Sequence, residues 1–268
     1  MTLEEFFKEY HKAAIGFSGG VDSSYLLYAA SRCEADVTAY YVKTSFQPAF
    51  ELEDARRIAA ETGARLKILE YDILQDAQVT AHPPNRCYYC KTKIFSEICR
   101  AARADGYELV LDGTNASDDP GDRPGNRALH ELGVLSPLAM CGLTKTEVRR
   151  RSKEAGLFTW DKPSYACLAT RIPADVPIRQ EMLTRIEKGE DLLRREGFTD
   201  CRLRWRDGAA LIQVPEDQID QVVQKRKTLL PRLQEWFPQV SLDLQGRIAF
   251  DEKPDEKPDE KPKEEESQ

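Results

Sequence analysis

A pair of adjacent glycines between an apolar run and a helical pattern limits most strongly what this chain can fold into. Residues 13–18 (AAIGFS) are predicted to form a short buried strand, and apolar residues recur at helical spacing over 22–33. A strand that passes through Gly19 and Gly20 directly into a helix brings backbone N–H groups and the helix N-terminus to one point, which favours an anion such as a phosphate. A glycine turn with a capping aspartate or serine would produce the same local pattern.

Strand-like and helical segments alternate through the first part of the chain. The predicted strands after the first one are 37–42, 65–71 and 109–111, and the predicted helices are 52–62, 92–104 and 144–155. This alternation favours an α/β fold with a doubly wound parallel sheet, in which ligands bind at the carboxyl ends of the strands. We therefore expect Gly19, 87–90 and 112–115 to lie near one edge of the sheet.

The pattern changes after about residue 175. A predicted helix at 178–196 is followed by alternating strands at 201–206 and 209–214, joined by Asp207-Gly208, which is typical of a hairpin turn. A helix at 216–236 and a strand at 240–244 complete a small α+β unit. We divide the chain into a first domain (1–170), a small domain for substrate binding or oligomerisation (171–250) and a tail (251–268).

The tail repeats DEKP three times, and its prolines and dense charge predict disorder. It holds nine acidic residues and four lysines, so it carries −5 of the net charge of −7 and leaves −2 for the rest. This balance is not the basic footprint of a nucleic-acid-binding protein. No apolar run approaches the roughly 20 residues that cross a membrane, and the start of the chain lacks the apolar region of a signal peptide. We expect a cytoplasmic protein without nucleic-acid or membrane partners.

The loop SGGVDS at 18–23 has no lysine after its glycines, so it is not a P-loop of the Walker type. It resembles the pyrophosphate loop of the PP-loop ATPases, and the resemblance extends over about residues 10–160, including LDGTN at 111–115. It implies cleavage of ATP between the α- and β-phosphates and adenylylation of a carboxylate or carbonyl oxygen. A Mg²⁺ ion between Asp22 and the phosphates would offset the negative charge of that side chain. The expected ATP-binding residues are Ser18, Gly19, Gly20, Asp22, Ser23, Gly113 and Arg123.

Seven cysteines, an odd number, in a reducing compartment argue against a disulfide framework. Cys87 and Cys90 have CxxC spacing, which fits a redox pair, half of a zinc site or two thiols by chance. Cys167 lies in PSYACLATRIP, where Arg171 would lower the pKa of its thiol. The remaining cysteines are expected to be buried structural thiols, namely Cys33, Cys99, Cys141 and Cys201.

The segment 160–173 (WDKPSYACLATRIP), together with 112–125 (DGTNASDDPGDRPG) and the small C-terminal domain, resembles the LarE family. Members of that family are ATP-dependent sulfur transferases that help to make the nickel-pincer nucleotide cofactor of lactate racemase. The resemblance implies adenylylation of pyridinium-3,5-biscarboxylate mononucleotide and replacement of a carboxylate oxygen by sulfur. It makes Cys167 the sulfur-bearing residue, which in single-cysteine members gives up its own sulfur and becomes dehydroalanine.

This sequence departs from the single-cysteine pattern because it also has Cys87 and Cys90. Three-cysteine members are understood to hold a [4Fe-4S] cluster on these thiols, which leaves one iron free to carry an extra sulfide. We favour a cluster on Cys87, Cys90 and Cys167 over the sacrifice of Cys167, because CxxC with the loop cysteine is a specific set. A sulfide source or a cysteine desulfurase would then be a partner, and the resemblance also implies a homo-oligomer.

Charged residues near the small domain are candidates for binding the nucleotide substrate. Arg202 and Arg204 alternate in CRLRWR and share one strand face, and arginine suits bidentate contact with phosphate or carboxylate. Charges of this kind also protect a solvated edge strand, but the resemblance favours substrate binding by Arg171, Arg202 and Arg204. Glu190 matches a glutamate of the family's site and is a candidate catalytic base, a metal ligand or an exposed helix charge. Lys145 reaches phosphate or supports the helix cap.

Three other functions stay open from the sequence. A tRNA-thiolating PP-loop enzyme would use the same cysteines, although the near-neutral charge and the lack of a basic appended domain count against it. An amide-forming synthetase would leave the cysteines without a role. A non-catalytic nucleotide-binding or iron–sulfur protein would form no AMP.

Overall fold

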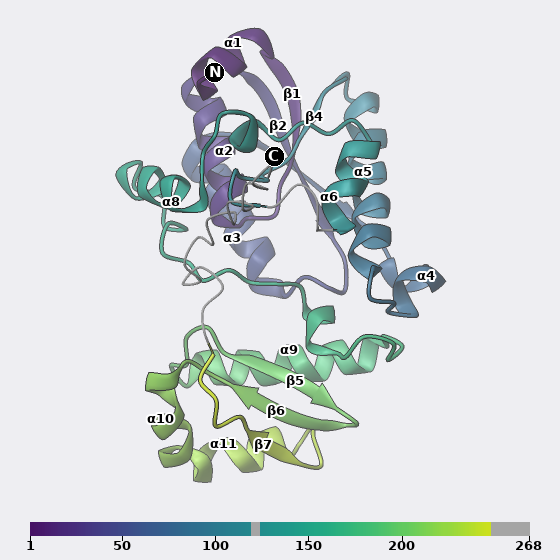
Figure 1. The fold of residues 1–268 in the computed structure, drawn as a ribbon, viewed down its shortest axis with the longest axis vertical. Coiled ribbons are helices and arrows are strands. Elements are labelled where there is room, and N and C mark those ends of the chain that lie inside the picture. The colour runs from purple at the N-terminus through teal and green to yellow at the C-terminus, as the bar shows by residue number, and fades with distance from the viewer. Residues whose placement is uncertain (119–123, 248–268) are drawn as a thin grey trace, which may run out of the picture.

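The first two thirds of the chain fold around a parallel sheet (Figure 1). The computed structural model describes residues 1–118 and 124–247, so the predicted disordered tail at 251–268 lies outside the described residues. The strand order is β3-β2-β1-β4, and the four strands pair in parallel, which confirms the predicted α/β class. The strands are β1 (Lys12–Gly16), β2 (Asp36–Lys43), β3 (Arg65–Glu70) and β4 (Val110–Leu111).

Helices cover both faces of this sheet. Successive residues of β1 point to opposite faces, so Ile15 packs with the helices of one side and Ala14 with those of the other. One side carries α1 (Leu3–Glu9), α2 (Val21–Arg32), α3 (Ala49–Thr62), α7 (Pro137–Met140) and α8 (Lys145–Glu154). The other side carries α5 (Arg86–Ala104) and α6 (Pro124–Glu131). Within the described ranges, no helix is both long and apolar enough for a membrane crossing.

The strand order places a topological switch point between β1 and β4. The glycine loop follows β1 and the LDGTN segment follows β4, and neighbouring strands that lead to opposite sides of a sheet open a crevice at their carboxyl ends. The two loops that the sequence singled out therefore begin side by side, at the place where such folds bind ligands.

Helix α5 starts earlier than the sequence pattern predicted. We expected a helix from residue 92, but α5 begins at Arg86, so Cys87 and Cys90 lie in its first two turns rather than before it. Several side chains of these turns line a cavity instead of the core, which explains why the apolar spacing begins later. The end of α3 was predicted correctly, because Gly63 ends that helix with a φ of +66°.

The remaining elements form a smaller unit below the sheet in Figure 1. The helix α9 (Gln180–Arg195) packs against a sheet made of β5 (Arg202–Arg206), β6 (Ala209–Gln213) and β7 (Val240–Leu242). Strands β5 and β6 form the predicted hairpin, whose turn residues Asp207 and Gly208 have φ values of +49° and +89°.

The predicted single helix at 216–236 was wrong. This segment forms three shorter elements, η3 (Glu216–Gln218), α10 (Ile219–Gln224) and α11 (Arg226–Leu233). Pro231 lies inside α11 and has no N–H to donate, and its ring clashes with the carbonyl one turn before it. Pro231 therefore disfavours a straight run within α11, whereas the break between α10 and α11 lies at Lys225, before the proline.

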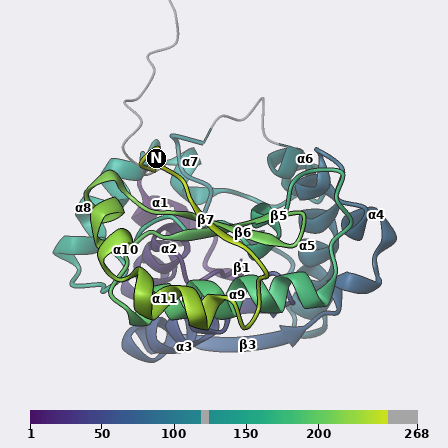
Figure 2. The same ribbon diagram turned by 90° about the horizontal axis from the view of Figure 1, so that it is seen from below.

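The two units share one apolar cluster, and Figure 2, seen from below, shows α9 and the small sheet in front of the larger unit. Phe46 and Cys90 from the larger unit pack in the same cluster as Leu168 and Ile186. The backbone N–H of Leu168 also donates to the carbonyl of Phe46 at 2.9 Å. The short elements at this junction are η1 (Ile73–Gln75), α4 (Ala77–Thr80) and η2 (Leu168–Arg171). The domain boundary between residues 170 and 171 stays a prediction.

Candidate active site

The glycine loop is built so that only backbone and small side chains face the ligand crevice. Gly19 has a φ of +73°, and a Cβ atom added to it would lie 3.1 Å from the carbonyl oxygen of Glu51. Gly20 is the N-cap of α2, and the hydroxyls of Ser18 and Ser23 lie 3.1 Å apart across the loop. The first N–H groups of α2 have no partner within their own helix, so this loop offers the donors that a phosphate needs.

Gly113 brings the LDGTN segment against the first turn of α2. A Cβ atom at this position would lie 2.9 Å from the backbone nitrogen of Ser23, closer than real side chains pack. The neighbouring Asp112 is buried and accepts hydrogen bonds from the hydroxyls of Thr114 and Ser136. Close backbone contact and these hydrogen bonds therefore hold this segment beside the glycine loop. The predicted ATP contact Arg123 lies outside the described residues.

Asp22 projects from α2 into the crevice and pairs with a lysine from α8. Its carboxylate accepts a hydrogen bond from Nζ of Lys145 at 2.6 Å and one from Nδ2 of Asn115 at 3.3 Å. Burial raises the pKa of Asp22 above its ordinary value, although Lys145 opposes this effect. The cap of α8 belongs to Thr144, whose hydroxyl accepts from the N–H of Glu147, so the side chain of Lys145 is free to act at Asp22.

Two cavities of about 440 and 470 Å³ meet at this crevice. Both are lined by Ser18, Asp22, Cys87 and Lys91, so they are two lobes of one depression. The lobes differ in their remaining walls. The first extends to Tyr41, Glu51, Lys162, Tyr165 and Cys167, and the second extends to Asp112, Gly113, Thr114 and Asn126.

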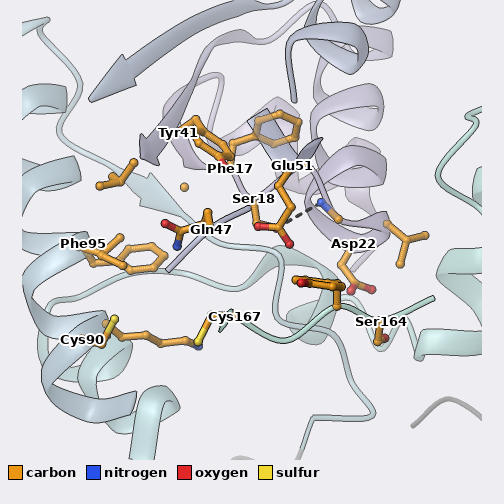
Figure 3. A pocket seen from close by; sticks show the side chains of 18 of the residues that line it. Phe17, Ser18, Asp22, Tyr41, Gln47, Glu51, Cys90, Phe95, Ser164 and Cys167 are labelled. Carbon is orange, nitrogen blue, oxygen red and sulfur yellow. Dashed lines mark hydrogen bonds between the residues drawn. The ribbon is translucent and has the colours of Figure 1, made fainter. Parts of the chain in front are cut away.

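The three cysteines that the sequence grouped together line the first lobe. Figure 3 shows Cys90 and Cys167 across this pocket from Ser18. Nη2 of Arg86 lies 3.5 Å from the sulfur of Cys87 and 3.5 Å from the sulfur of Cys167, so one guanidinium touches both. Burial, together with the neighbouring thiols, raises the pKa of Cys90 to about 12. The structure thus brings α5 and the segment before η2 together at one cluster of thiols.

The other four cysteines were expected to be buried, and only two of them are. Cys99 and Cys201 are buried, whereas Cys33 and Cys141 are half-buried at the edge of an apolar cluster. None of these four lines either lobe. They therefore stay separate from the three grouped thiols.

Arg171 and Glu190 form a buried ion pair next to the segment that contains Cys167. Arg171 is 1% exposed and Glu190 is 0% exposed, so the interpretation of Glu190 as an exposed helix charge was wrong. Nε of Arg171 donates to Glu190 at 2.8 Å, and Glu190 also accepts from the hydroxyl of Tyr165 and the N–H of Leu203. Burial alone would raise the pKa of Glu190, but these donors hold it below its ordinary value. A carboxylate with these partners stays ionised.

The guanidinium groups of Arg202 and Arg204 donate hydrogen bonds to backbone carbonyls and do not face only solvent. Nη2 of Arg202 donates to the carbonyl of Ser164 at 2.6 Å, and Nη1 of Arg204 donates to the carbonyl of Thr170 at 2.6 Å. Nη1 of Arg171 donates to the carbonyl of Ala166 at 2.8 Å. The three predicted substrate-binding arginines thus clamp the segment 164–170, which contains Cys167. Neither these arginines nor Glu190 lines the two lobes.

Two residues of the first lobe escaped the sequence analysis. Glu51 lies in the first turn of α3, where an acidic residue is ordinary at a helix N-terminus. Its side chain instead enters the pocket near Ser18 (Figure 3), and burial raises its pKa to about 7 although Lys162 and Lys43 oppose the shift. Arg86 directly precedes Cys87, and a charge beside a CxxC pair was the available signal.

Comparison with known proteins finds one family model and several relatives that resemble this chain. A family model for asparagine synthase matches residues 11–118, which hold the glycine loop and LDGTN. An uncharacterized protein of Synechocystis sp. is 38% identical over 252 residues, covering 91% of this chain and 93% of the relative. The tRNA-specific 2-thiouridylase MnmA of Nocardioides sp. is 30% identical over 71% of this chain and 66% of the relative.

A relative with a known name covers almost the whole chain. The pyridinium-3,5-bisthiocarboxylic acid mononucleotide synthase of Lactiplantibacillus plantarum is 30% identical over 248 residues, which cover 91% of this chain and 90% of the relative. A match of this length reaches both the larger and the smaller unit. The chain therefore belongs to the LarE family of PP-loop proteins, which are ATP-dependent sulfur transferases.

Proposed function

We propose that this sulfur transferase acts on pyridinium-3,5-biscarboxylate mononucleotide and converts a carboxylate into a thiocarboxylate. The observation that carries the proposal is that the phosphate loop and the three thiols line one cavity. Activation by ATP and delivery of sulfur then take place without release of the activated intermediate. The name of the relative from L. plantarum supports this choice of substrate.

The reaction has two steps with distinct demands. A carboxylate oxygen attacks the α-phosphorus of ATP, the bond to the β-phosphate oxygen breaks, and pyrophosphate leaves. A sulfur nucleophile then attacks the carbonyl carbon of the acyl-adenylate, the bond to the phosphate oxygen breaks, and AMP leaves with the electron pair. The N–H groups of the loop at 18–23 hold the phosphates in the first step. The carboxylate of Asp22 is an oxygen ligand suited to Mg²⁺ beside those phosphates.

We further propose that Cys87, Cys90 and Cys167 hold a [4Fe-4S] cluster. No group of three or more histidine, cysteine, aspartate or glutamate side chains in the described parts of the chain is already arranged to hold a single metal ion. The donor set nevertheless fits a cluster, because three free thiols converge on one cavity and thiolates are the usual ligands of iron–sulfur clusters. When bound, such a cluster would supply an iron without a protein ligand that can carry sulfide.

The alternative source of sulfur is Cys167 itself. In that route the Cys167 sulfur bonds to the acyl carbon as AMP leaves, and a base then removes the Cα proton so that the Cβ–S bond breaks. The products are the thiocarboxylate and dehydroalanine. The half-buried thiol of Cys167 lines the cavity and is accessible for this attack.

One anaerobic experiment tests the function and separates the two routes. The purified chain is assayed for iron and acid-labile sulfide, then incubated with ATP, Mg²⁺, sulfide and the dicarboxylate mononucleotide. We expect AMP, pyrophosphate and a product in which sulfur replaces oxygen, with about four iron atoms per chain. An iron-free active chain whose Cys167 loses the elements of hydrogen sulfide would support sacrifice. No sulfur-containing product under any loading would contradict the proposed substrate.

A tRNA substrate is the second candidate, because the thiouridylase relative shares 30% identity over 71% of this chain. The net charge of −2 before the acidic tail gives little attraction for a polyanion. We therefore expect labelled tRNA to stay unbound at physiological salt. Tight binding, followed by sulfur incorporation into tRNA, would reverse the order of the two candidates.

The predicted site roles of the small unit stay proposals. The contacts of Arg171, Arg202, Arg204 and Glu190 support a positioning role, in which they fix the backbone around Cys167. The sulfide source, the homo-oligomer and the cytoplasmic location stay predictions.

A further inference from the structure

We propose that Arg86 is a positioning residue that holds the sulfur atoms of Cys87 and Cys167 together at the wall of the ATP cavity. Its use in sulfur transfer depends on the function proposed above, whereas the positioning itself does not. The guanidinium donates from a single nitrogen, Nη2, to both sulfur atoms at 3.5 Å. One side chain therefore connects the first turn of α5 to a segment about 80 residues later in the chain.

The environment of Arg86 explains why its hydrogen bonds go to sulfur. The residue is 3% exposed, and its guanidinium lies 5.4 Å from the centre of the Phe46 ring. A buried charge needs polar or anionic partners. Among the described residues, no carboxylate forms an ion pair with Arg86, and the recorded partners of its guanidinium are the two thiols. The site is therefore built to place a cation against sulfur.

Other cations of the same lobe have different partners. Lys145 pairs with Asp22, and Lys162 pairs with Asp54. Lys91, one turn after Cys87 on α5, lines both lobes without a recorded hydrogen bond to a thiol. Arg86 thus differs from the other cations because it contacts the thiols. Lys91 carries the same positive charge and lines the same cavity, so it serves as a control.

The position of Arg86 suits either source of sulfur. The backbone of the Cys167 segment is fixed from one side by the arginines of the small unit, while Arg86 holds the thiol from the other side. If Cys167 gives up its sulfur, the same guanidinium lies beside the attacking atom. If the three cysteines hold a cluster, hydrogen bonds to its sulfur atoms are a known determinant of reduction potential.

The first test uses the metal-free, reduced chain without substrate. A short bifunctional thiol reagent bridges Cys87 and Cys167 only when the two thiols are close, and a monofunctional reagent of the same chemistry corrects for thiol reactivity. We expect Arg86→Met to lower the corrected rate of bridging about tenfold, as for the loss of one charge-assisted hydrogen bond. Arg86→Lys should restore part of it, and Lys91→Met should change it less than about twofold.

The second test measures a property of the loaded chain other than activity. After reconstitution with iron and sulfide, Arg86→Met should shift the reduction potential and the electron paramagnetic resonance spectrum, and Arg86→Lys should lie between it and the wild type. Bridging at the wild-type rate in Arg86→Met, or an equal loss in Lys91→Met, would overturn the proposal. If Arg86→Met does not fold, Arg86→Gln, which keeps donors without the charge, takes its place in both tests. A wild-type chain that bridges normally but forms no thiocarboxylate would disprove the proposed function and leave the role of Arg86 standing.

Discussion

Cys167 combines a fixed backbone with a reachable thiol. Its segment is held at the carbonyls of Ala166 and Thr170 by arginines, while the thiol faces the cavity beside Arg86. A nucleophile gains most from such an arrangement, because correct placement lowers the entropic cost of reaching the acyl carbon. The same residue is needed in both proposed routes.

Replacement of Cys167 therefore separates binding from chemistry. Cys167→Ala should reduce thiocarboxylate formation to background, while the affinity for ATP stays within about twofold, because the phosphate loop lies on the other wall. Product analysis by mass spectrometry and calorimetric titration with a non-hydrolysable ATP analogue measure the two effects. Cys141→Ala, a half-buried thiol away from both lobes, is the matched control and should keep sulfur transfer. A Cys167→Ala chain that still turns over would rule out both routes.

The raised pKa of Glu51 predicts that the stability of the fold depends on pH. Its pKa is raised from 4.5 to about 7, so the folded chain binds more protons than the unfolded chain between these values. The free energy of unfolding should therefore fall as pH rises through this window, and the buried charge destabilises the fold fully above pH 7. Glu51→Gln should be more stable than the wild type at pH 8, by about 2 kcal/mol, and nearly equal to it at pH 5.

Urea unfolding at the two pH values measures this difference. Glu53→Gln, an exposed acid on the same helix, is the control and should show no comparable change. Equal stability of the Glu51→Gln and wild-type chains at pH 8 would show that burial of the ionised Glu51 carboxylate does not destabilise the fold.

At this scale the sequence supports some assignments and not others. Ser18 and Gly19 were recognisable because SGGVDS resembles the loop of the PP-loop ATPases, since a glycine pair alone also fits a capped turn. Glu51 was not, since its role depends on what lies across the pocket and not on its neighbours in the chain. The pair of Arg171 with Glu190 was missed for the same reason, because it joins residues on two elements.

The elements around the cavity contact one another through backbone atoms at glycine positions. The loop after β4 touches the first turn of α2 at Gly113, and the loop after β1 touches α3 at Gly19. These contacts bring the start of α2 to the cavity wall, which Ser18, Gly19 and Gly20 also line. Strand ends and helix starts therefore set the shape of the proposed phosphate site.

Gly113→Ala should weaken ATP binding without unfolding the chain. Its added Cβ would lie 2.9 Å from the nitrogen of Ser23, so the start of α2 must shift. We expect about a tenfold loss of affinity for an ATP analogue, since overpacking of this kind costs about 1–3 kcal/mol. Calorimetric titration gives the affinity.

Gly142→Ala provides the control for this change. Gly142 has a φ of +68° and no atom within 4 Å of an added Cβ, so alanine there strains the backbone without touching the site. That variant should lose about 1 kcal/mol of stability but keep its affinity for ATP. Unchanged affinity in Gly113→Ala would mean that the loop can retreat without affecting the phosphate site.

Element boundaries show where sequence patterns stop being informative. The alternation of strands and helices was readable because β1, β2 and β4 are buried on both faces and the helices are amphipathic. The start of α5 was not readable, because Arg86, Cys87 and Lys91 of its first turns line a cavity and do not follow the apolar spacing of a core helix. The break between α10 and α11 lies at Lys225, before Pro231, within a pattern that otherwise favours one helix.

In the whole molecule the small unit acts on the cavity through the Cys167 segment. Arginines on β5 reach carbonyls of this segment, and both units share an apolar cluster around Phe46 and Leu168. The arginine pattern on the strand was predicted correctly, but the partner, a backbone about 35 residues away in the chain, was not. Such long-range contacts are fixed by the packing of the units.

Arg204→Met tests whether the clamp positions sulfur or binds substrate. A positioning role predicts a lower kcat for sulfur transfer, by about tenfold, with little change in KM, because the loss of one charge-assisted hydrogen bond loosens the Cys167 segment. A rise in KM alone would instead support the substrate contact that the sequence suggested. Arg206→Met, at the exposed end of the same strand, is the control and should behave as the wild type.

The joined lobes around a single phosphate loop have a consequence for the order of product release. The proposed substrate carries two carboxylates at positions 3 and 5 of its ring, while the described residues provide one loop to activate them. Each visit to the cavity can then convert only one carboxylate, and the half-converted nucleotide must leave or turn round before a second ATP is used. A species with one sulfur should accumulate early in a time course and decline as the doubly converted product appears.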